Sequence, residues 1–93
     1  MTTETVYIGR KPAMNYVLAV VRSFTAADVE KVVLKARGMA IKTAVDVAEM
    51  TCRRFLGNVT VDKINIGSED ISVKESNRTK TVSTIEITLT RSS

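Results

Sequence analysis

The sequence nearly lacks several residue types on which catalysis and metal binding usually depend. It contains no histidine and a single cysteine, Cys52, so the common zinc sites, histidine-based acid–base catalysis and an internal disulfide are excluded. Its apolar runs, such as Val17–Val21, are far shorter than the roughly 18 residues of a membrane-spanning helix, and no signal-sequence pattern opens the chain. We therefore expect a cytoplasmic protein with no membrane contact, no metal and no cofactor.

Acidic residues are outnumbered by basic ones. The 93 residues include 14 Lys and Arg against 10 Asp and Glu, which gives a net charge of +4 and a pI near 9.5. The 44% hydrophobic and 26% charged residues are typical of a folded domain rather than a disordered tail. A moderate positive charge favours a polyanionic partner, which includes both nucleic acid and an anionic membrane surface.

The first half of the chain alternates between strand and helix patterns. A β-prone run at 5–8 precedes an apolar 3.6-residue period over about 12–24, and a β-branched run follows at 28–38. A second helical period covers 41–56 and stops at Gly57. The predicted core stripe of this second helix consists of Ile41, Ala44, Val45, Ala48, Cys52, Phe55 and Leu56.

The second half of the chain changes to a period of two. Ile64 and Ile66 alternate with polar residues, and so do the apolar residues of 83–89, which predicts two strands with a bulge at Gly67. Residues 74–80 contain no apolar side chain and are predicted to form a solvated hairpin tip. The whole chain is thus expected to be one domain, a two-layer α/β sandwich of order β-α-β-α-β-β, with two helices packed on a small mixed sheet and an extended hairpin arm.

Basic side chains gather at both junctions between strand and helix, in the segments 9–12 and 35–38. A helix N-terminus disfavours a cation by about 0.3–1 kcal/mol and attracts an anion, so this placement is easier to understand if a phosphate binds there. If the first two strands are parallel, both junctions lie on one edge of the sheet. Each basic pair alone is typical of a solvated loop. The predicted patch consists of Arg10, Lys11, Lys35, Arg37 and Lys42, and a second basic group on the hairpin tip consists of Lys74, Arg78 and Lys80.

No set of catalytic residues emerges, so we expect a protein that is not an enzyme. Lys42 with Asp46, and Glu49 with Arg53, are spaced as ion pairs one helical turn apart. Cys52 lies on the predicted core stripe, which favours a buried, inert thiol. Asp46 and Glu49 could also be interpreted as paired carboxylates, and Asp62, Glu69 and Asp70 as metal ligands, but none has a partner nucleophile at a meaningful spacing.

Apolar residues of the second helix are predicted to stay exposed. Val47 and Met50 lie off its main stripe, and Phe55 and Leu56 lie at its C-terminal end. A homodimer would cover this surface and would double the net charge of +4.

Four segments of the chain carry the motifs of one family. They are VYIGRKPAMNYVLA at 6–19, KARGMAIKTAVD at 35–46, RRFL at 53–56 and VSTIEI at 82–87. These motifs resemble the Alba family of archaeal chromatin proteins over nearly the whole chain. The resemblance implies a chromosome-associated homodimer with a fold similar to the C-terminal domain of translation initiation factor three. It also implies binding of double-stranded DNA, and often of RNA, without strong sequence preference.

The resemblance also implies roles for particular residues. The backbone-contacting basic pair of the first loop falls on Arg10 and Lys11, and the arginine of the second loop falls on Arg37. Phe55 would join neighbouring dimers into arrays, and the arms that reach toward the minor groove would carry Lys74, Arg78 and Lys80. Arg10 replaces the lysine that this family acetylates, which leaves Lys11 as the modification candidate. Met39 replaces a second arginine, which removes one cation from the patch.

Three other functions stay open from the sequence. In the first alternative the chain binds chiefly structured RNA, because phosphates and helix shape offer similar targets in DNA and RNA. Alternatively it would be a ribonucleoprotein assembly subunit that uses its apolar helix surface to hold a partner. A small hydrolase is the third alternative, and it lacks a plausible residue set.

Overall fold

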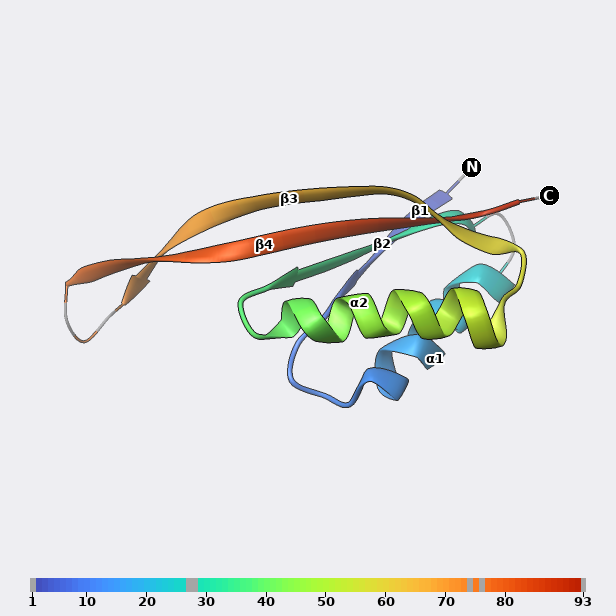
Figure 1. Cartoon of the computed structure of the whole chain (residues 1–93), viewed down its shortest axis with the longest axis horizontal. Coiled ribbons are helices and arrows are strands. Elements are labelled where there is room, and N and C mark those ends of the chain that lie inside the picture. The colour runs from blue at the N-terminus through green and yellow to red at the C-terminus, as the bar shows by residue number, and fades with distance from the viewer. Residues whose placement is uncertain (1, 27–28, 74, 76, 93) are drawn as a thin grey trace.

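The computed structural model describes residues 2–26, 29–73, 75 and 77–92, and it has the predicted two-layer architecture. Two helices cover one face of a four-stranded sheet, and a two-stranded hairpin projects far beyond the body (Figure 1). Both chain termini lie at the end of the molecule opposite the hairpin tip. The elements are β1 (Thr2–Tyr7), α1 (Ala13–Thr25), β2 (Val29–Arg37), α2 (Ala40–Met50), the π-helical turn η1 (Thr51–Phe55), β3 (Val59–Val73) and β4 (Arg78–Arg91).

The sheet is mixed, with the strand order β1-β2-β4-β3. β1 and β2 are parallel, whereas β4 is antiparallel to both β2 and β3. The β1-α1-β2 connection therefore brings the carboxyl ends of β1 and β2 to the same edge of the sheet. The parallel pairing on which the predicted basic patch depended is confirmed.

The core lies between the helices and one face of the sheet. Strand side chains alternate between the two faces, so every second residue of β2 and β4 points toward the helices. Burying an aliphatic side chain of this size stabilises the fold by about 1.5–3 kcal/mol. The buried residues from the two central strands are Val32, Leu34, Ala36, Ile85, Ile87 and Leu89, and those from the helices are Val17, Val20, Phe24, Ala44, Val47 and Ala48.

The predicted core stripe of the second helix is partly wrong. Val47, expected at the surface, is fully buried, whereas Val45 is 43% exposed. Both flank the buried pair Ala44 and Ala48, and the period alone could not decide which flank faces the sheet. Phe55 leaves the stripe because α2 ends in a π-helical turn, in which Leu56 N–H donates to the Thr51 carbonyl at 2.8 Å. This i→i+5 pattern inserts an extra residue and shifts the phase of everything after it.

The hairpin differs from its prediction in two places. The register shift lies between Val61 and Lys63, and Gly67 pairs regularly with Thr84, so the bulge predicted at Gly67 is wrong. A Cβ at Gly67 would lie 3.3 Å from the Thr84 hydroxyl oxygen, so close approach explains this glycine better than a bulge does. The arm is also strand for longer than predicted, because β3 continues to Val73 and β4 begins at Arg78.

Candidate nucleic-acid interface

Two chain segments leave the sheet side by side at the carboxyl ends of β1 and β2. Tyr7 is in register with Lys35, and Ile8 N–H donates to the Lys35 carbonyl at 2.8 Å. The arm starts at the same place, because Gly38 N–H donates to the Ser83 carbonyl of β4 at 2.9 Å. The first loop, the second loop and the root of the arm therefore meet at one edge of the sheet.

The first loop is held in place by Tyr16 of α1. The Tyr16 hydroxyl accepts hydrogen bonds from the backbone N–H groups of Gly9, at 2.9 Å, and Lys11, at 3.1 Å. A Cβ at position 9 would lie 3.3 Å from that hydroxyl oxygen, which favours glycine there. The loop is thus fixed while the side chains of Arg10 and Lys11 stay exposed, and in the described residues neither forms an ion pair.

Neither helix start at this edge is neutralised by the protein itself. In the described structure α1 and α2 have no side-chain cap and no acidic residue in their first turns. Their free N–H groups and positive dipole ends therefore remain available to an anion. Gly38, with φ of +58°, makes the turn between β2 and α2 and has open space around it.

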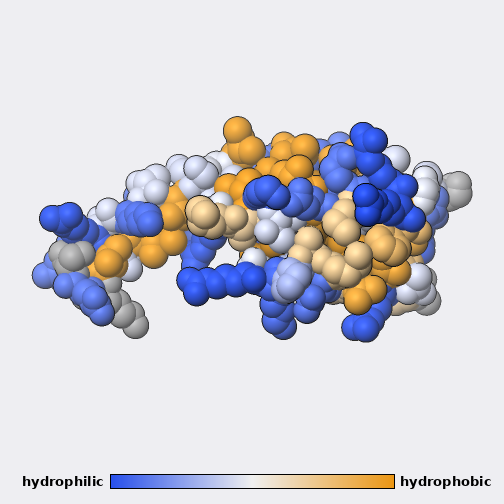
Figure 2. All heavy atoms as spheres, turned by 60° about the horizontal axis from the view of Figure 1, so that its bottom comes forward, coloured by the Kyte–Doolittle hydropathy of each residue, from blue (hydrophilic) through white to orange (hydrophobic). Residues whose placement is uncertain are grey.

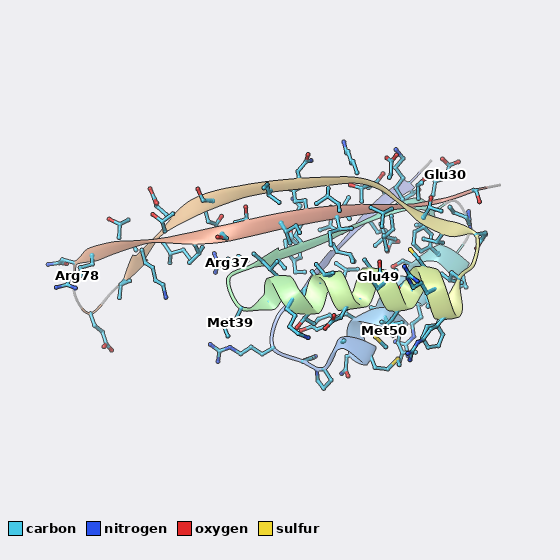
Figure 3. All side chains as sticks on the ribbon, in the orientation of Figure 1. Glu30, Arg37, Met39, Glu49, Met50 and Arg78 are labelled. Carbon is cyan, nitrogen blue, oxygen red and sulfur yellow. The ribbon has the colours of Figure 1, made fainter. Side chains whose placement is uncertain are left out.

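The second loop carries a cation that is already paired within the protein. The Arg37 guanidinium lies 2.5 Å from a carboxylate oxygen of Glu69, on β3 in the arm, and the two side chains are 61% and 48% exposed. Arg37 also lines a shallow hollow together with Arg10 of the first loop, Gly38 and Met39. Figure 3 shows Arg37 and Met39 near the turn that leads into α2. The structure thus brings Arg10 and Arg37 together, as predicted.

Two other predicted binding residues have different surroundings. Lys42 is exposed and pairs with Asp46 at 2.8 Å, and this hydrogen bond, with the charge of Asp46, raises the pKa of Lys42. Lys35 is half-buried and lies on the face of the sheet away from the helices, since its neighbours Leu34 and Ala36 point into the core. The predicted patch therefore extends around the sheet edge onto both sides. The second predicted helical ion pair, between Glu49 and Arg53, is also present, at 2.5 Å.

The basic residues of the arm lie far from those of the loops. Arg78 is at the distal end of the hairpin in Figure 3, whereas Arg37 pairs with Thr84 at its root. Six strand residues separate the two positions, a length of about 20 Å at 3.3 Å per residue. Arg78 and Lys80 belong to β4 rather than to a loop, and Lys74 lies outside the described residues. The structure therefore gives two separate basic regions on a molecule 49 Å long.

Apolar residues are exposed on the helix side of the body, where Figure 2 shows a broad hydrophobic area. Of the predicted contact residues, Phe55 is 46% exposed, Met50 and Leu56 are half-buried, and Val47 is excluded because it is buried. The prediction missed several exposed side chains. For those on β3, the alternation of an edge strand looks the same whether or not a helix reaches it. The missed residues are Met14, Leu18 and Val45 on the helices, and Ile64 and Ile66 on β3.

The remaining candidate sites are the single cysteine and the acidic side chains. Cys52 is half-buried, and burial, followed by the charge of Glu49, raises the pKa of its thiol. Within the described residues no group of three or more His, Cys, Asp or Glu side chains is placed to hold a metal ion. None of the helices in the described part of the chain has the length and apolar character that crossing a bilayer requires.

Comparison with known proteins identifies relatives over nearly the full length. The family model described as Alba matches residues 4–68. The DNA/RNA-binding protein Alba of Methanococcus maripaludis is 48% identical over 90% of this chain and 93% of its own length. DNA/RNA-binding protein Alba 1 of Archaeoglobus fulgidus is 47% identical over 98% of this chain and 99% of its own.

Solved structures show the same fold. Alba from Thermoplasma volcanium superimposes with a TM-score of 0.86 at 42% identity, covering 94% of this chain and 99% of that one. A more distant structure, ALBA1 from Trypanosoma brucei, gives a TM-score of 0.69 at 27% identity, over 95% of this chain and 68% of that chain. The body and the arm are thus shared with proteins of moderate sequence identity.

Proposed function

This chain belongs to the Alba family, and from that premise we propose that it binds double-stranded nucleic acid as a homodimer, without sequence preference. The observation that carries the proposal is the parallel pairing of β1 and β2, which places two uncapped helix starts and their basic loops on one edge. Relatives at 44–51% identity are named DNA/RNA-binding proteins, which supports DNA and RNA as partners. The role is one of binding, with no reaction assigned to it.

The two loops supply the contacts to phosphate. Arg10 and Arg37 are exposed and line the same hollow, and a guanidinium donates two parallel hydrogen bonds to a phosphate. Lys11 adds a flexible point charge next to the start of α1. Such contacts carry no base information, which fits binding without sequence preference. Acetylation of Lys11 would remove one of these charges.

The arm supplies a second contact at a distance. Beyond its root β3 and β4 pair only with each other, so the arm is a two-stranded ribbon whose far end carries Arg78 and Lys80. With the loops on the phosphate backbone, the arm would reach about 20 Å along the duplex and bring Arg78 and Lys80 to the minor groove. A homodimer would carry two such arms.

The dimer contact in this proposal lies on the helix side. Met50 and Leu56 lie near the end of the helical layer and pack against the core, and Ile64 and Ile66 are exposed on β3. Ile66 is 82% exposed and points to the same face of the sheet as the core residue Ile85, with which it pairs. Covering such residues provides the driving force for association. Phe55 would further join dimers into arrays on chromosomal DNA.

Salt dependence of duplex binding tests the proposal. Arg10, Lys11 and Arg37 of both protomers neutralise about six phosphates, so the logarithm of the binding constant should fall against the logarithm of salt with a slope near −5. The slope would be measured by fluorescence anisotropy on duplexes of unrelated sequence, with light scattering to report the dimer. A flat salt response, or strong preference for one sequence, would contradict the proposal.

Matched DNA and RNA duplexes in the same assay would rank the two polymers. A dimer with no affinity for either would favour the alternative role as an assembly subunit.

A further inference from the structure

Tyr7 is an exposed aromatic side chain that phosphate binding at the loops does not use. The chain has two tyrosines and two phenylalanines. Tyr16 holds the first loop, Phe24 is in the core and Phe55 lies at the end of the helical layer. Tyr7 is 73% exposed, and its hydroxyl makes no hydrogen bond within the described structure. Nothing in the packing of the fold therefore accounts for a large aromatic ring at this position.

The ring lies on the face of the sheet that the helices leave open. Its neighbour Val6 is in register with the core residue Leu34 and packs against the core, so Tyr7, one residue on, points to the opposite face. Tyr7 is adjacent to Lys35, which is adjacent to Glu86, so the three residues form a row across β1, β2 and β4. Neighbouring strands lie about 4.8 Å apart, so these side chains can contact a single small planar group.

The surroundings of Tyr7 favour an uncharged group rather than another phosphate. Tyr7 lines a shallow hollow whose charged members are Lys35, Arg37, Glu69 and Glu86, two cations and two carboxylates. Because these charges balance, the hollow attracts a phosphate less than the loop edge does, where Arg10 and Lys11 have no acidic partner in the described structure. Arg10, next to Lys11 in the first loop, lines the other hollow, which shares Ile8 and Arg37 with this one. An aromatic platform next to a phosphate-binding edge is the arrangement that binds a nucleobase together with its flanking backbone.

We propose that the Tyr7 ring stacks on an unpaired nucleobase, so that the open face of the sheet binds single-stranded nucleic acid beside the duplex-binding edge. The inference rests on the proposed function only in that the same loop cations hold the flanking phosphates. A base inside a duplex is stacked on its neighbours and has no free face to offer, so Tyr7 contributes nothing to duplex binding. Tyr7 is in this way a residue that distinguishes single strands from duplexes.

Tyr7→Ala tests the proposal, with Tyr7→Phe as the matched control that keeps the ring. Binding of an oligouridylate, an oligodeoxythymidylate of equal length and a DNA duplex would be measured by anisotropy. Tyr7→Ala should weaken binding of the single strands by at least about fivefold per stacked base and leave the duplex unchanged. Tyr7→Phe should bind all three as the wild type does. Thermal unfolding would show that the exposed position tolerates alanine.

Intrinsic fluorescence gives a second readout, because the chain has no tryptophan and only two tyrosines. A stacked base should quench the emission of Tyr7 in the wild type. In Tyr7→Phe, where Tyr16 is the remaining tyrosine, the single strand should bind without this quenching.

The proposal is overturned if the wild type does not bind single strands, or if Tyr7→Ala leaves their binding unchanged. An equal loss on single strands and on duplex would also overturn it, since that result assigns Tyr7 to the common phosphate contacts. Loss on either single strand, with the duplex unaffected, supports it. Failure of the wild type to bind duplex would instead count against the proposed function, so the two failures are distinguishable.

Discussion

We expect Glu69 to compete with nucleic acid for Arg37, so that replacing Glu69 strengthens duplex binding. The two side chains are joined at 2.5 Å in the free protein, and both are about half exposed. A phosphate that binds Arg37 through Nη1 has to displace the carboxylate, because that nitrogen already donates to Glu69. Glu69 then remains close to a second negative group. Glu69→Gln removes both costs while keeping the size of the side chain.

The magnitude follows from the exposure of the pair. An ion pair this open to solvent contributes about 0–1 kcal/mol, so we take about 0.5 kcal/mol per protomer. A dimer that uses both Arg37 residues should then gain about 1 kcal/mol, which is roughly fivefold in Kd. The gain should shrink as salt rises, because exposed charges are screened.

Glu86→Gln is the matched control. Glu86 lines the hollow beside Tyr7, which Arg37 and Glu69 also line, and it faces Lys35 across the strands. In the described structure it forms no ion pair with Arg37. The Glu86→Gln variant removes the same charge from the same region without releasing Arg37. In duplex titrations by fluorescence anisotropy at one salt concentration, Glu69→Gln should bind more tightly than Glu86→Gln, and both should bind more tightly than the wild type.

A double-mutant cycle separates the pair from the general charge effect. In an Arg37→Gln background, replacing Glu69 should increase the affinity for duplex by no more than replacing Glu86 does. Equal effects of the two glutamate variants in the wild-type background would refute the competition. Weaker binding by Glu69→Gln would mean that the carboxylate positions Arg37 for the phosphate instead.

Three further predictions concern the loops, the helix end and the core. Lys11→Ala with Arg37→Ala should weaken binding equally on unrelated duplexes and make the salt slope shallower by about 3 to 4 per dimer. Arg22, in the last turn of α1, and Lys31, near the start of β2, lie away from the edge, so Arg22→Ala with Lys31→Ala should leave that slope unchanged. A sequence-selective loss would contradict the assignment. Phe55→Ala should preserve the folded dimer but make coating of long DNA less cooperative in gel-shift titrations, and an unaltered titration shape would exclude that role. Thr51→Val should raise the free energy of unfolding in urea by about 1 kcal/mol, because the buried Thr51 hydroxyl has no hydrogen-bond partner in the described structure; a loss of stability would show that the hydroxyl is satisfied.

The sequence predicted the element order and the clustering of Arg10 with Arg37 because both depend on local periods. The helical repeat, the two-residue alternation and the β-α-β connection together fix which loops share an edge. The exposed face of α2 could not be predicted in the same way. The π-helical turn at 51–55 shifts the phase of the stripe, and no residue type in that segment marks it.

Contacts between distant segments could not be predicted from the sequence either. Arg37 and Glu69 are 32 residues apart, and their pairing depends on the register of three strands. That register includes a shift between Val61 and Lys63 that the sequence pattern placed at Gly67 instead. A displacement of one residue in β3 would have turned Glu69 to the other face of the sheet. The same uncertainty hid the exposure of Ile64 and Ile66, which depends on β3 being an edge strand.

The positions of the proposed binding residues are fixed by the core through the last three residues of β2. Ala36 is buried against the helices, so Lys35 and Arg37 on either side of it must point to the open face. Tyr7 follows the same rule through its register with Lys35, and Ile8, buried next to it, holds the start of the first loop. A register slip of one residue would bury these charges and expose the core, a cost far above the weak energies of the contacts they make. These exposed side chains make only weak contacts of their own. Their positions are therefore set by the buried residues that alternate with them along the same strands.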